Sequence, residues 1–331
     1  MAGQDESSGP EWDEGGPVKN FLEHLEDFRW VLVKSAAVVG LGMLLCLVGA
    51  NYVIGVIKWP MTRAKVSYPG TNQIALINFG TNRIGKFQLT TEQQAALHLG
   101  TNRFVSIQVD PVTFGTNQVL GWSVSADPGV AAEAQRMHVD LVNLNPAGGF
   151  FVAFQVAIYG GLLLAAPFVL YFVGSFVFPA LKINEKKPIF RALLIGGGLF
   201  IIGVSFCYFV LMPVALQASQ MYSQWLGLGA FEWRAEEYIS FVCKFMLGMG
   251  LGFELPVVIL TLVKIGILNY KQLRSMWRYM IVINLILGAL LTTPEVVTQV
   301  LMAGPLYMLY EITVWIAWYW EWRDRRRGLI S

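Results

Sequence analysis

One carboxylate lies deep inside a long apolar run, and it is the residue best suited to do chemistry. Glu254 falls a little past the middle of Tyr238–Val263, a run long enough to cross a bilayer. A carboxylate at that depth costs roughly 2.5–3.5 kcal/mol on insertion scales, so we expect it to face a bundle interior or a wet cavity. Pro256 removes a helix hydrogen bond nearby and favours a bend. Three glycines in the preceding two turns permit close helix approach or a water-lined groove: Gly248, Gly250 and Gly252.

A second group of charged residues lies where apolar runs meet basic segments. Glu23, Glu26 and Asp27 precede the first run, and Glu185 follows the second. An acidic cluster at a membrane surface can receive a cationic peptide, because a carboxylate and a guanidinium pair through two hydrogen bonds. The alternative is ordinary solvated charge with ion pairs to the adjacent lysines, and composition alone favours that alternative.

The composition predicts an integral membrane protein. The 331-residue chain is 55% hydrophobic and 14% charged, whereas soluble domains carry about 25% charged residues. Its cysteines lie in apolar runs and its histidines are scattered, so we expect neither a metal site nor another cofactor. No nucleotide-binding loop, His-Glu-x-x-His motif or nucleophile triad is present, which argues against an enzyme. The acidic first twenty residues do not resemble a cleavable signal, so we expect the first apolar run to be retained as a helix.

Six apolar runs predict six transmembrane helices. They cover approximately Val31–Ile57, Phe150–Phe178, Ile189–Gln217, Tyr238–Val263, Tyr279–Leu291 and Val296–Trp318. Crossing the hydrocarbon core requires about 20 residues, so the fifth run is too short to cross unless the bilayer thins or protein covers its ends. Apolar residues at helical spacing from Phe21 to Leu32 predict an amphipathic helix on the membrane surface that turns into the first span.

Lysines and arginines gather in alternate connections and in the tail, which sets the orientation. The segments 179–191, 264–278 and 321–331 are basic, whereas 218–237 carries one arginine and 292–295 carries no base. Under the positive-inside rule both termini are cytoplasmic. The chain therefore divides into a disordered cytoplasmic head, an amphipathic helix with the first span, an extracytoplasmic insert, a bundle of spans two to six and a basic cytoplasmic tail. These parts cover 1–19, 20–57, 58–149, 150–320 and 321–331.

The insert at 58–149 has the pattern of a small β-rich unit. The tripeptide Gly-Thr-Asn occurs four times, beginning at positions 70, 80, 100 and 115. Because glycine and asparagine tolerate positive φ, these copies are expected to form turns. β-favouring runs surround them at 73–77, 104–107 and 118–122, and 91–99 predicts a short helix capped by a threonine. No catalytic constellation is present, so we interpret the insert as a decoration of the membrane unit, which long loops tolerate cheaply.

Several short motifs occur in a single order along the chain. They are His24-Leu25-Glu26-Asp27-Phe28-Arg29, Ala166-Pro167, Phe176…Pro179-Ala180-Leu181…Glu185, Tyr208-Phe209…Pro213, Phe253-Glu254-Leu255-Pro256 and Leu290-Leu291-Thr292-Thr293-Pro294-Glu295…Gln299. With these motifs the chain resembles the TatC family, the polytopic core of the twin-arginine protein translocase, over about 20–57 and 147–320. The resemblance implies an all-α polytopic membrane protein with six transmembrane helices, N-in/C-in, and the β-rich extracytoplasmic insert between helices 1 and 2.

The resemblance also implies roles for residues at the cytoplasmic surface. The paired arginines of a signal peptide would contact Glu185, helped by Phe176, Asp27, Arg29 and Pro179. Position 27 departs from the family pattern, which usually has Glu there. The charge is kept, and its reach is shorter by one methylene.

Further roles are implied within the membrane and at its outer side. Glu254, together with Pro256, resembles the family's intramembrane acid, which polarises a concave groove. Glu295 and Gln299 resemble the polar pair at the outer start of the sixth helix, which is implicated in contacts with single-span partners. Pro60 resembles the proline that follows the first span, and Glu295 stands where the family usually has Asp.

The function implied is that of the membrane core and signal-peptide receptor of the twin-arginine translocase. Such a protein binds twin-arginine signal peptides and nucleates a translocation complex driven by the proton-motive force, in the bacterial cytoplasmic (inner) membrane. The implied partners are TatA/TatB-like single-span membrane proteins, folded proteins with twin-arginine signal peptides and the lipid bilayer, in a multi-copy complex without nucleic acid. Two alternatives stay open: a proton- or ion-coupled small-solute transporter using Glu254, and a scaffold in which Glu254 only bonds a neighbouring helix.

Overall fold

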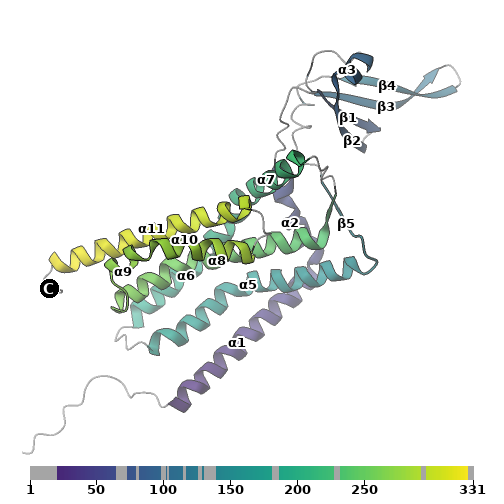
Figure 1. Ribbon diagram of the computed structural model, residues 1–331. Helices are drawn as coiled ribbons and strands as arrows, with labels where there is room; N and C mark the ends of the chain where they lie inside the picture. The colour runs from purple at the N-terminus through teal and green to yellow at the C-terminus, as the bar shows by residue number, and fades with distance from the viewer. Residues whose placement is uncertain are drawn as a thin grey trace, which may run out of the picture.

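The computed structural model in Figure 1 is a bundle of long helices with a small β-sheet at one end. It describes residues 21–64, 73–79, 82–97, 102, 104–114, 117–125, 129, 139–180, 186–226, 232–291 and 296–326. The predicted head at 1–19, the predicted site residues Glu185 and Glu295, and the end of the tail at 327–331 lie outside the described residues.

The first helix, α1 (Phe21–Val48), contains both the amphipathic segment and most of the first predicted span. The sequence had suggested a turn between these two segments. The helix is continuous instead, and no turn separates them. The helix is interrupted later, at Gly49, where ψ is 16°; glycine is a poor helix former because it loses the most backbone freedom on folding. Helix α2 (Ala50–Arg63) follows and runs beyond the predicted end of the span at Ile57.

Five helices in the described part of the chain are long and apolar enough to cross a membrane. They cover Leu25–Val48, Gly148–Phe176, Leu194–Trp225, Ala235–Lys264 and Val296–Arg326. The corresponding elements are α1, α5 (Gly148–Ala180), the segment from α6 to α7, α8 (Ala235–Lys264) and α11 (Val296–Arg326). The fifth predicted span corresponds to α10 (Trp277–Leu291), whose 15 residues extend only about 22 Å at 1.5 Å per residue.

The third span is built from three consecutive pieces. Helix α6 (Lys186–Phe206) leads into a π-helical turn, η1 (Cys207–Leu211), and then into α7 (Met212–Trp225). Pro213 cannot donate to the carbonyl group four residues before it, and the wide π turn accommodates that loss without ending the helix. The predicted end at Gln217 was therefore too early, since the helix continues to Trp225.

Helix α8 packs against α5, α6, α10 and α11. Its three predicted close-approach glycines are all buried: Gly248, Gly250 and Gly252. An added Cβ at Gly250 would lie 2.6 Å from a ring carbon of Phe200 in α6, and one at Gly248 would lie 2.5 Å from Leu291 Cδ1 in α10. At Gly252 the neighbour is Leu306 of α11. Close helix approach at these glycines is thus confirmed.

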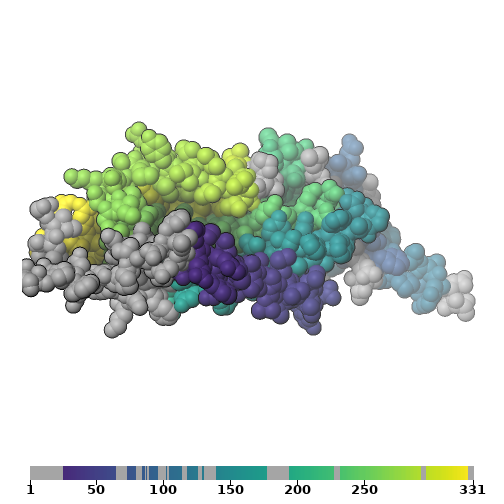
Figure 2. All heavy atoms as spheres, turned by 90° about the horizontal axis from the view of Figure 1, so that it is seen from below, coloured from purple at the N-terminus to yellow at the C-terminus, as the bar shows by residue number. Residues whose placement is uncertain are grey.

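Helix α1 lies beside α5 on one side of the bundle (Figure 2). Small residues bring the two backbones together, because an added Cβ at Gly42 would lie 2.8 Å from the carbonyl oxygen of Gly161. Elsewhere on α1, leucines such as Leu44 and Leu45 are exposed. This combination fits a helix that packs through one narrow small-residue strip and faces lipid with the rest of its surface.

A four-stranded sheet lies between α2 and α5 in the chain. Its strands are β1 (Gln73–Phe79), β2 (Asn82–Leu89), β3 (Phe104–Phe114) and β4 (Asn117–Ser125), in the order β2-β1-β3-β4. β1 pairs antiparallel with β2 and parallel with β3, and β3 pairs antiparallel with β4. Phe79 lies opposite Asn82 and Phe114 opposite Asn117, so the Gly-Thr-Asn copies at 80–82 and 115–117 connect paired strands, where turns were predicted.

The short helix predicted in this unit is also present, as α3 (Thr91–Leu97). Thr90 precedes it and accepts a hydrogen bond from the Gln93 N–H at 3.4 Å, while Gln93 Oε1 accepts one from the Thr90 N–H at 3.0 Å. This reciprocal pair is a capping box, so the expected threonine cap is confirmed. Strand β2 was not predicted from the sequence.

Two further strands fasten the starts of two helices to each other. β5 (Asp140–Val142) precedes α5, β6 (Glu232–Arg234) precedes α8, and the two strands pair in parallel. In Figure 1, β5 and the four-stranded sheet lie at the end of the bundle opposite the C-terminus and α9 (Tyr270–Ser275). We call the end that carries α9 and the C-terminus the basic end, because Lys271, Arg274 and the arginines of the last turn of α11 lie there.

Candidate functional site

At the basic end, the start of α1 meets the end of α5. The rings of Phe28 and Phe176 have centroids 5.5 Å apart. This contact joins the segment of α1 and the segment of α5 that carry predicted site residues. Asp27 is half-buried and Arg29 is exposed beside Phe28, and Pro179 follows Phe176 by three residues within α5. Four of the five residues predicted to bind a signal peptide therefore lie on the two helix ends that this contact joins, Asp27 and Arg29 on α1 and Phe176 and Pro179 on α5.

Glu254 lies in the interior of the bundle, as its residue type and depth predicted. Its side chain is 9% exposed, and its carboxyl points at α6, where an added Cβ at Gly196 would lie 2.7 Å from Oε2. Oε1 is buried without a hydrogen-bond partner among the described residues. The scaffold alternative requires a hydrogen bond from Glu254 to a neighbouring helix, so this geometry does not favour it.

Pro256 is buried in the same helix. As a proline it leaves the carbonyl group of Gly252 without its usual helical donor, in the turn where α8 touches Leu306 of α11. Glu254 therefore lies in a part of α8 with fewer internal hydrogen bonds and close neighbours on two sides.

Pro60 is buried in α2, and it disturbs that helix in a similar way. The carbonyl group of Val56, which has no helical donor at position 60, accepts a hydrogen bond from the Tyr208 hydroxyl at 2.7 Å. The next carbonyl group, that of Ile57, accepts one from the Tyr238 hydroxyl at 2.8 Å. Two other helical segments, η1 and α8, thus hold α2 at its proline. Tyr208 belongs to a sequence motif, but sequence reasoning did not predict that either tyrosine donates to α2, although the missing N–H of Pro60 was a signal that a donor was needed at Val56.

Gln299 lies near the start of α11 and is half-buried. An added Cβ at Gly288 of α10 would lie 3.4 Å from the Gln299 carbonyl oxygen, so the two helices approach closely there. Pro60 and Gln299 come from different helices, and both lie apart from the cluster at the basic end. The predicted residues consequently occupy separate regions: the basic end, the middle of α8, and the ends of α2 and α11.

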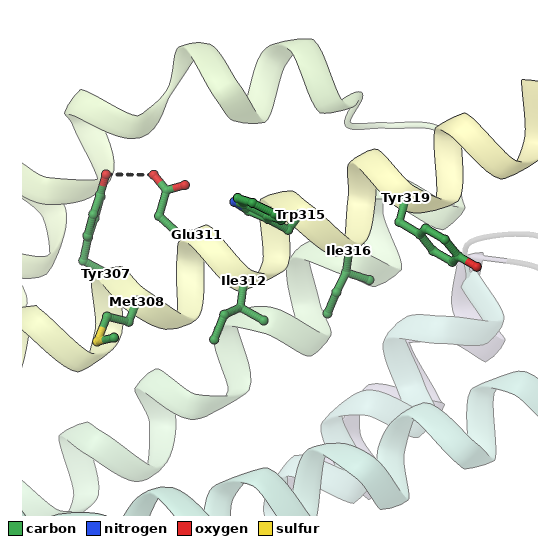
Figure 3. A pocket seen from close by; sticks show the side chains of 7 residues that line it. All are labelled: Tyr307, Met308, Glu311, Ile312, Trp315, Ile316 and Tyr319. Atoms are coloured by element: carbon green, nitrogen blue, oxygen red, sulfur yellow. Dashed lines mark hydrogen bonds between the residues drawn. The ribbon is translucent and has the colours of Figure 1, made fainter.

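The structure also shows a groove that sequence reasoning did not find. It has a volume of about 570 Å³ and is lined by one face of α11: Tyr307, Met308, Glu311, Ile312, Trp315, Ile316 and Tyr319. Glu311 accepts a hydrogen bond from the Tyr307 hydroxyl at 2.8 Å (Figure 3). It accepts a second one from Arg274 of α9 at 3.0 Å. Tyr307 and Glu311 are four residues apart, a spacing that could have indicated their contact, whereas the partner on α9 required the tertiary structure.

Comparison with known families identifies the family of this chain. A family model described as Sec-independent protein translocase protein (TatC) matches residues 23–305. This chain belongs to the TatC family. It is accordingly a membrane protein of a protein translocase, and the predicted resemblance is confirmed. Membership does not favour the alternative of a coupled small-solute transporter.

Individual TatC proteins support the same assignment. The TatC protein of Akkermansia muciniphila is 39% identical over 183 residues, which are 55% of this chain and 52% of that protein. The TatC protein of Aquifex aeolicus is 38% identical over 184 residues, or 54% of this chain and 74% of that protein. The match therefore spans about half the length of the first relative and about three quarters of the second.

A solved TatC structure matches over a larger part of the chain. It is described as the crystal structure of twin-arginine translocase receptor TatC, and it superposes with a TM-score of 0.61 at 27% sequence identity. The superposition covers 89% of this chain and 97% of the other. The arrangement of the TatC helices is thus shared beyond the segments that align in sequence.

Proposed function

We propose that this chain is the membrane core and signal-peptide receptor of a twin-arginine translocase. In this function it spans the bacterial cytoplasmic membrane six times with both termini in the cytoplasm, and the basic end is the cytoplasmic end. It binds the twin-arginine signal peptides of folded proteins. It then nucleates a complex with TatA/TatB-like single-span proteins, and the proton-motive force drives translocation.

The observation that carries the proposal is the contact between α1 and α5 at the basic end. The rings of Phe28 and Phe176 are 5.5 Å apart, and Asp27 adjoins Phe28 on α1, so the proposal uses a carboxylate and an aromatic ring from the two helix ends that meet there. A guanidinium can pair with a carboxylate through two hydrogen bonds and can also stack on an aromatic face. Paired arginines use both features, and Glu185, Arg29 and Pro179 complete the proposed binding set.

The remaining predicted residues have roles deeper in the membrane. The apolar part of the signal peptide lies along the groove polarised by Glu254 and Pro256. Helix α10 has 15 residues, fewer than the roughly 20 that span a bilayer of ordinary thickness, so the bilayer beside it is thinned. The single-span partners contact Glu295, Gln299 and Pro60 at the outer ends of α11 and α2.

The test is a binding assay with a labelled twin-arginine signal peptide and the purified full chain in detergent. Glu185→Ala and Asp27→Asn should each weaken binding at least about tenfold, because a hydrogen bond to a charged group contributes roughly 1.5–3 kcal/mol. A peptide with two lysines in place of the arginines should bind more weakly to the wild type, since lysine cannot form the paired hydrogen bonds. Higher salt should weaken both interactions.

Glu237→Gln is the matched control, because it removes one negative charge at the opposite end of the bundle. Glu237 is exposed and pairs with Arg234 at 3.1 Å, so its loss should leave peptide affinity unchanged. Full affinity in Glu185→Ala, or an equal loss in Glu237→Gln, would contradict a specific carboxylate site at the basic end.

A further inference from the structure

The helix opposite Glu254 has no side chain at the point of contact. α6 carries three consecutive glycines, Gly196, Gly197 and Gly198, and only the first of them faces the carboxyl. An added Cβ at Gly196 would lie 2.7 Å from Glu254 Oε2, 3.3 Å from Oε1 and 3.4 Å from Cδ. Oε2 therefore occupies the space that a side chain at position 196 would need, and the rest of the carboxyl group lies in contact with that space.

Nothing else in the described part of the chain fixes this carboxyl group. Glu254 is 9% exposed, and its Oε1 has no hydrogen-bond partner. Among the described residues, the contacts that locate the carboxyl group are therefore packing contacts with α6. If a side chain at position 196 took up the space, the carboxyl would have to move towards lipid or force α6 and α8 apart, and both displacements are costly.

We propose that Gly196 is the positioning residue for Glu254: its missing side chain lets the carboxyl lie between α6 and α8, and export depends on that placement. The inference rests on the proposed function, since it assigns a new residue to the same intramembrane site. The site around Glu254 therefore includes position 196 of α6 in addition to residues of α8.

Two other glycines of α6 separate this role from helix packing in general. Nothing lies within 4 Å of an added Cβ at Gly197. Alanine at that position therefore measures the effect of replacing a glycine of α6 without creating a new contact. An added Cβ at Gly203 would lie 2.7 Å from the Phe253 ring and 2.9 Å from the Met249 carbonyl oxygen. Alanine at Gly203 therefore crowds the same pair of helices without touching the carboxyl.

The experiment measures export of a folded reporter carrying a twin-arginine signal peptide, in cells whose only copy of this protein is the variant. Gly196→Ala, Gly197→Ala and Gly203→Ala are each placed in the wild-type and Glu254→Asp backgrounds, and membrane levels of each variant are measured by immunoblot. Aspartate withdraws the carboxyl by one methylene and makes room for a methyl group at position 196. The two substitutions should therefore be coupled, as contacting residues are.

We expect Gly196→Ala to lower export per molecule about tenfold in the wild type and to have little further effect in Glu254→Asp. Gly197→Ala should match the wild type, and any loss in Gly203→Ala should be the same in both backgrounds. Normal export by Gly196→Ala, or an equal loss in both backgrounds, would overturn the inference. Glu254→Ala tests the proposed function separately. If the Glu254→Ala variant exports normally, the role proposed for the carboxyl group is wrong. If it loses export while Gly196→Ala exports normally, only the positioning role of Gly196 is wrong.

Discussion

At the scale of single residues, Pro60 shows how one missing N–H group is compensated from elsewhere in the fold. The Val56 carbonyl group of α2 has no helical donor, because Pro60 carries no N–H group. The Tyr208 hydroxyl supplies the donor at 2.7 Å, and the ring of the same tyrosine stacks on Trp59 with centroids 5.3 Å apart. The Tyr208 side chain thus supplies the hydrogen bond that the Val56 carbonyl group lacks and also packs against α2. Tyr208 lies in the π turn η1, so that turn positions the donor.

Tyr208→Phe should therefore lower the free energy of unfolding by about 1 kcal/mol, the usual net contribution of one hydrogen bond. Pro60→Ala restores an N–H group that can donate to Val56, so the cost of Tyr208→Phe should disappear in that background. Thermal or denaturant unfolding in detergent measures both effects. Tyr52→Phe is the control, because this tyrosine of α2 is 85% exposed. An undiminished loss in the Pro60→Ala background would show that Val56 is not the relevant acceptor.

At the scale of secondary-structure elements, the pairing of α1 with α5 matters most for the proposed receptor site. The two helices meet through Gly42, Gly160 and Gly161, and an added Cβ at Gly161 would lie 2.5 Å from the backbone nitrogen of Met43. The same pair of helices carries Phe28 and Phe176 at the basic end. Because both helices are long, we expect a change of their spacing at the glycines to alter their spacing at the aromatic contact.

Gly161→Ala should push α1 away from α5, lower the unfolding temperature and weaken binding of the twin-arginine peptide. Backbone atoms rather than a flexible side chain occupy the space, so the clash cannot be relieved locally, and overpacking of this kind costs typically 1–3 kcal/mol. Gly40→Ala is the matched substitution on α1, since nothing lies within 4 Å of an added Cβ there. It should leave both measurements unchanged, and equal behaviour of the two variants would mean that the glycine contact does not control the site.

At the scale of the whole molecule, the chain is a helical bundle with a sheet inserted into one connection. The sheet has its own small core around Ala75, Leu89 and Val105. The chain leaves the bundle after Ala64 and returns at Val139, and both residues belong to the same hydrophobic cluster of the bundle. The two ends of the insert are thus fastened in the bundle independently of the sheet between them.

Replacing residues 66–138 with a Gly/Ser linker of about twelve residues, which spans roughly 20 Å on average, should leave the unfolding temperature of the bundle nearly unchanged. The linker adds little loop entropy, and the bundle core keeps both of its anchoring residues. Val139→Asp tests the sensitivity of the measurement, because it buries a charge in the bundle cluster and should destabilise strongly. A shortened chain that fails to fold would show that the sheet is part of the bundle's stability.

Much of this protein follows from sequence because the bilayer restricts what an apolar run can do. Five of the six predicted spans match helices long enough to cross, and the fifth run is short in the structure as in the sequence. The burial of Glu254 was also predictable, since a carboxylate in hydrocarbon must face inward. Residue preferences were sufficient for the threonine cap of α3 and for strands β1, β3 and β4.

Only the tertiary structure decided which helix each functional side chain meets. Nothing local to Glu254 indicates that it faces Gly196, and nothing local to Pro60 identifies Tyr208 as its substitute donor. The third span likewise continues past Gln217 to Trp225, because a π turn accommodates Pro213 without ending the helix. Periodicity fixes which residues must be buried, whereas the partner of each buried group is set by contacts between segments distant in the chain.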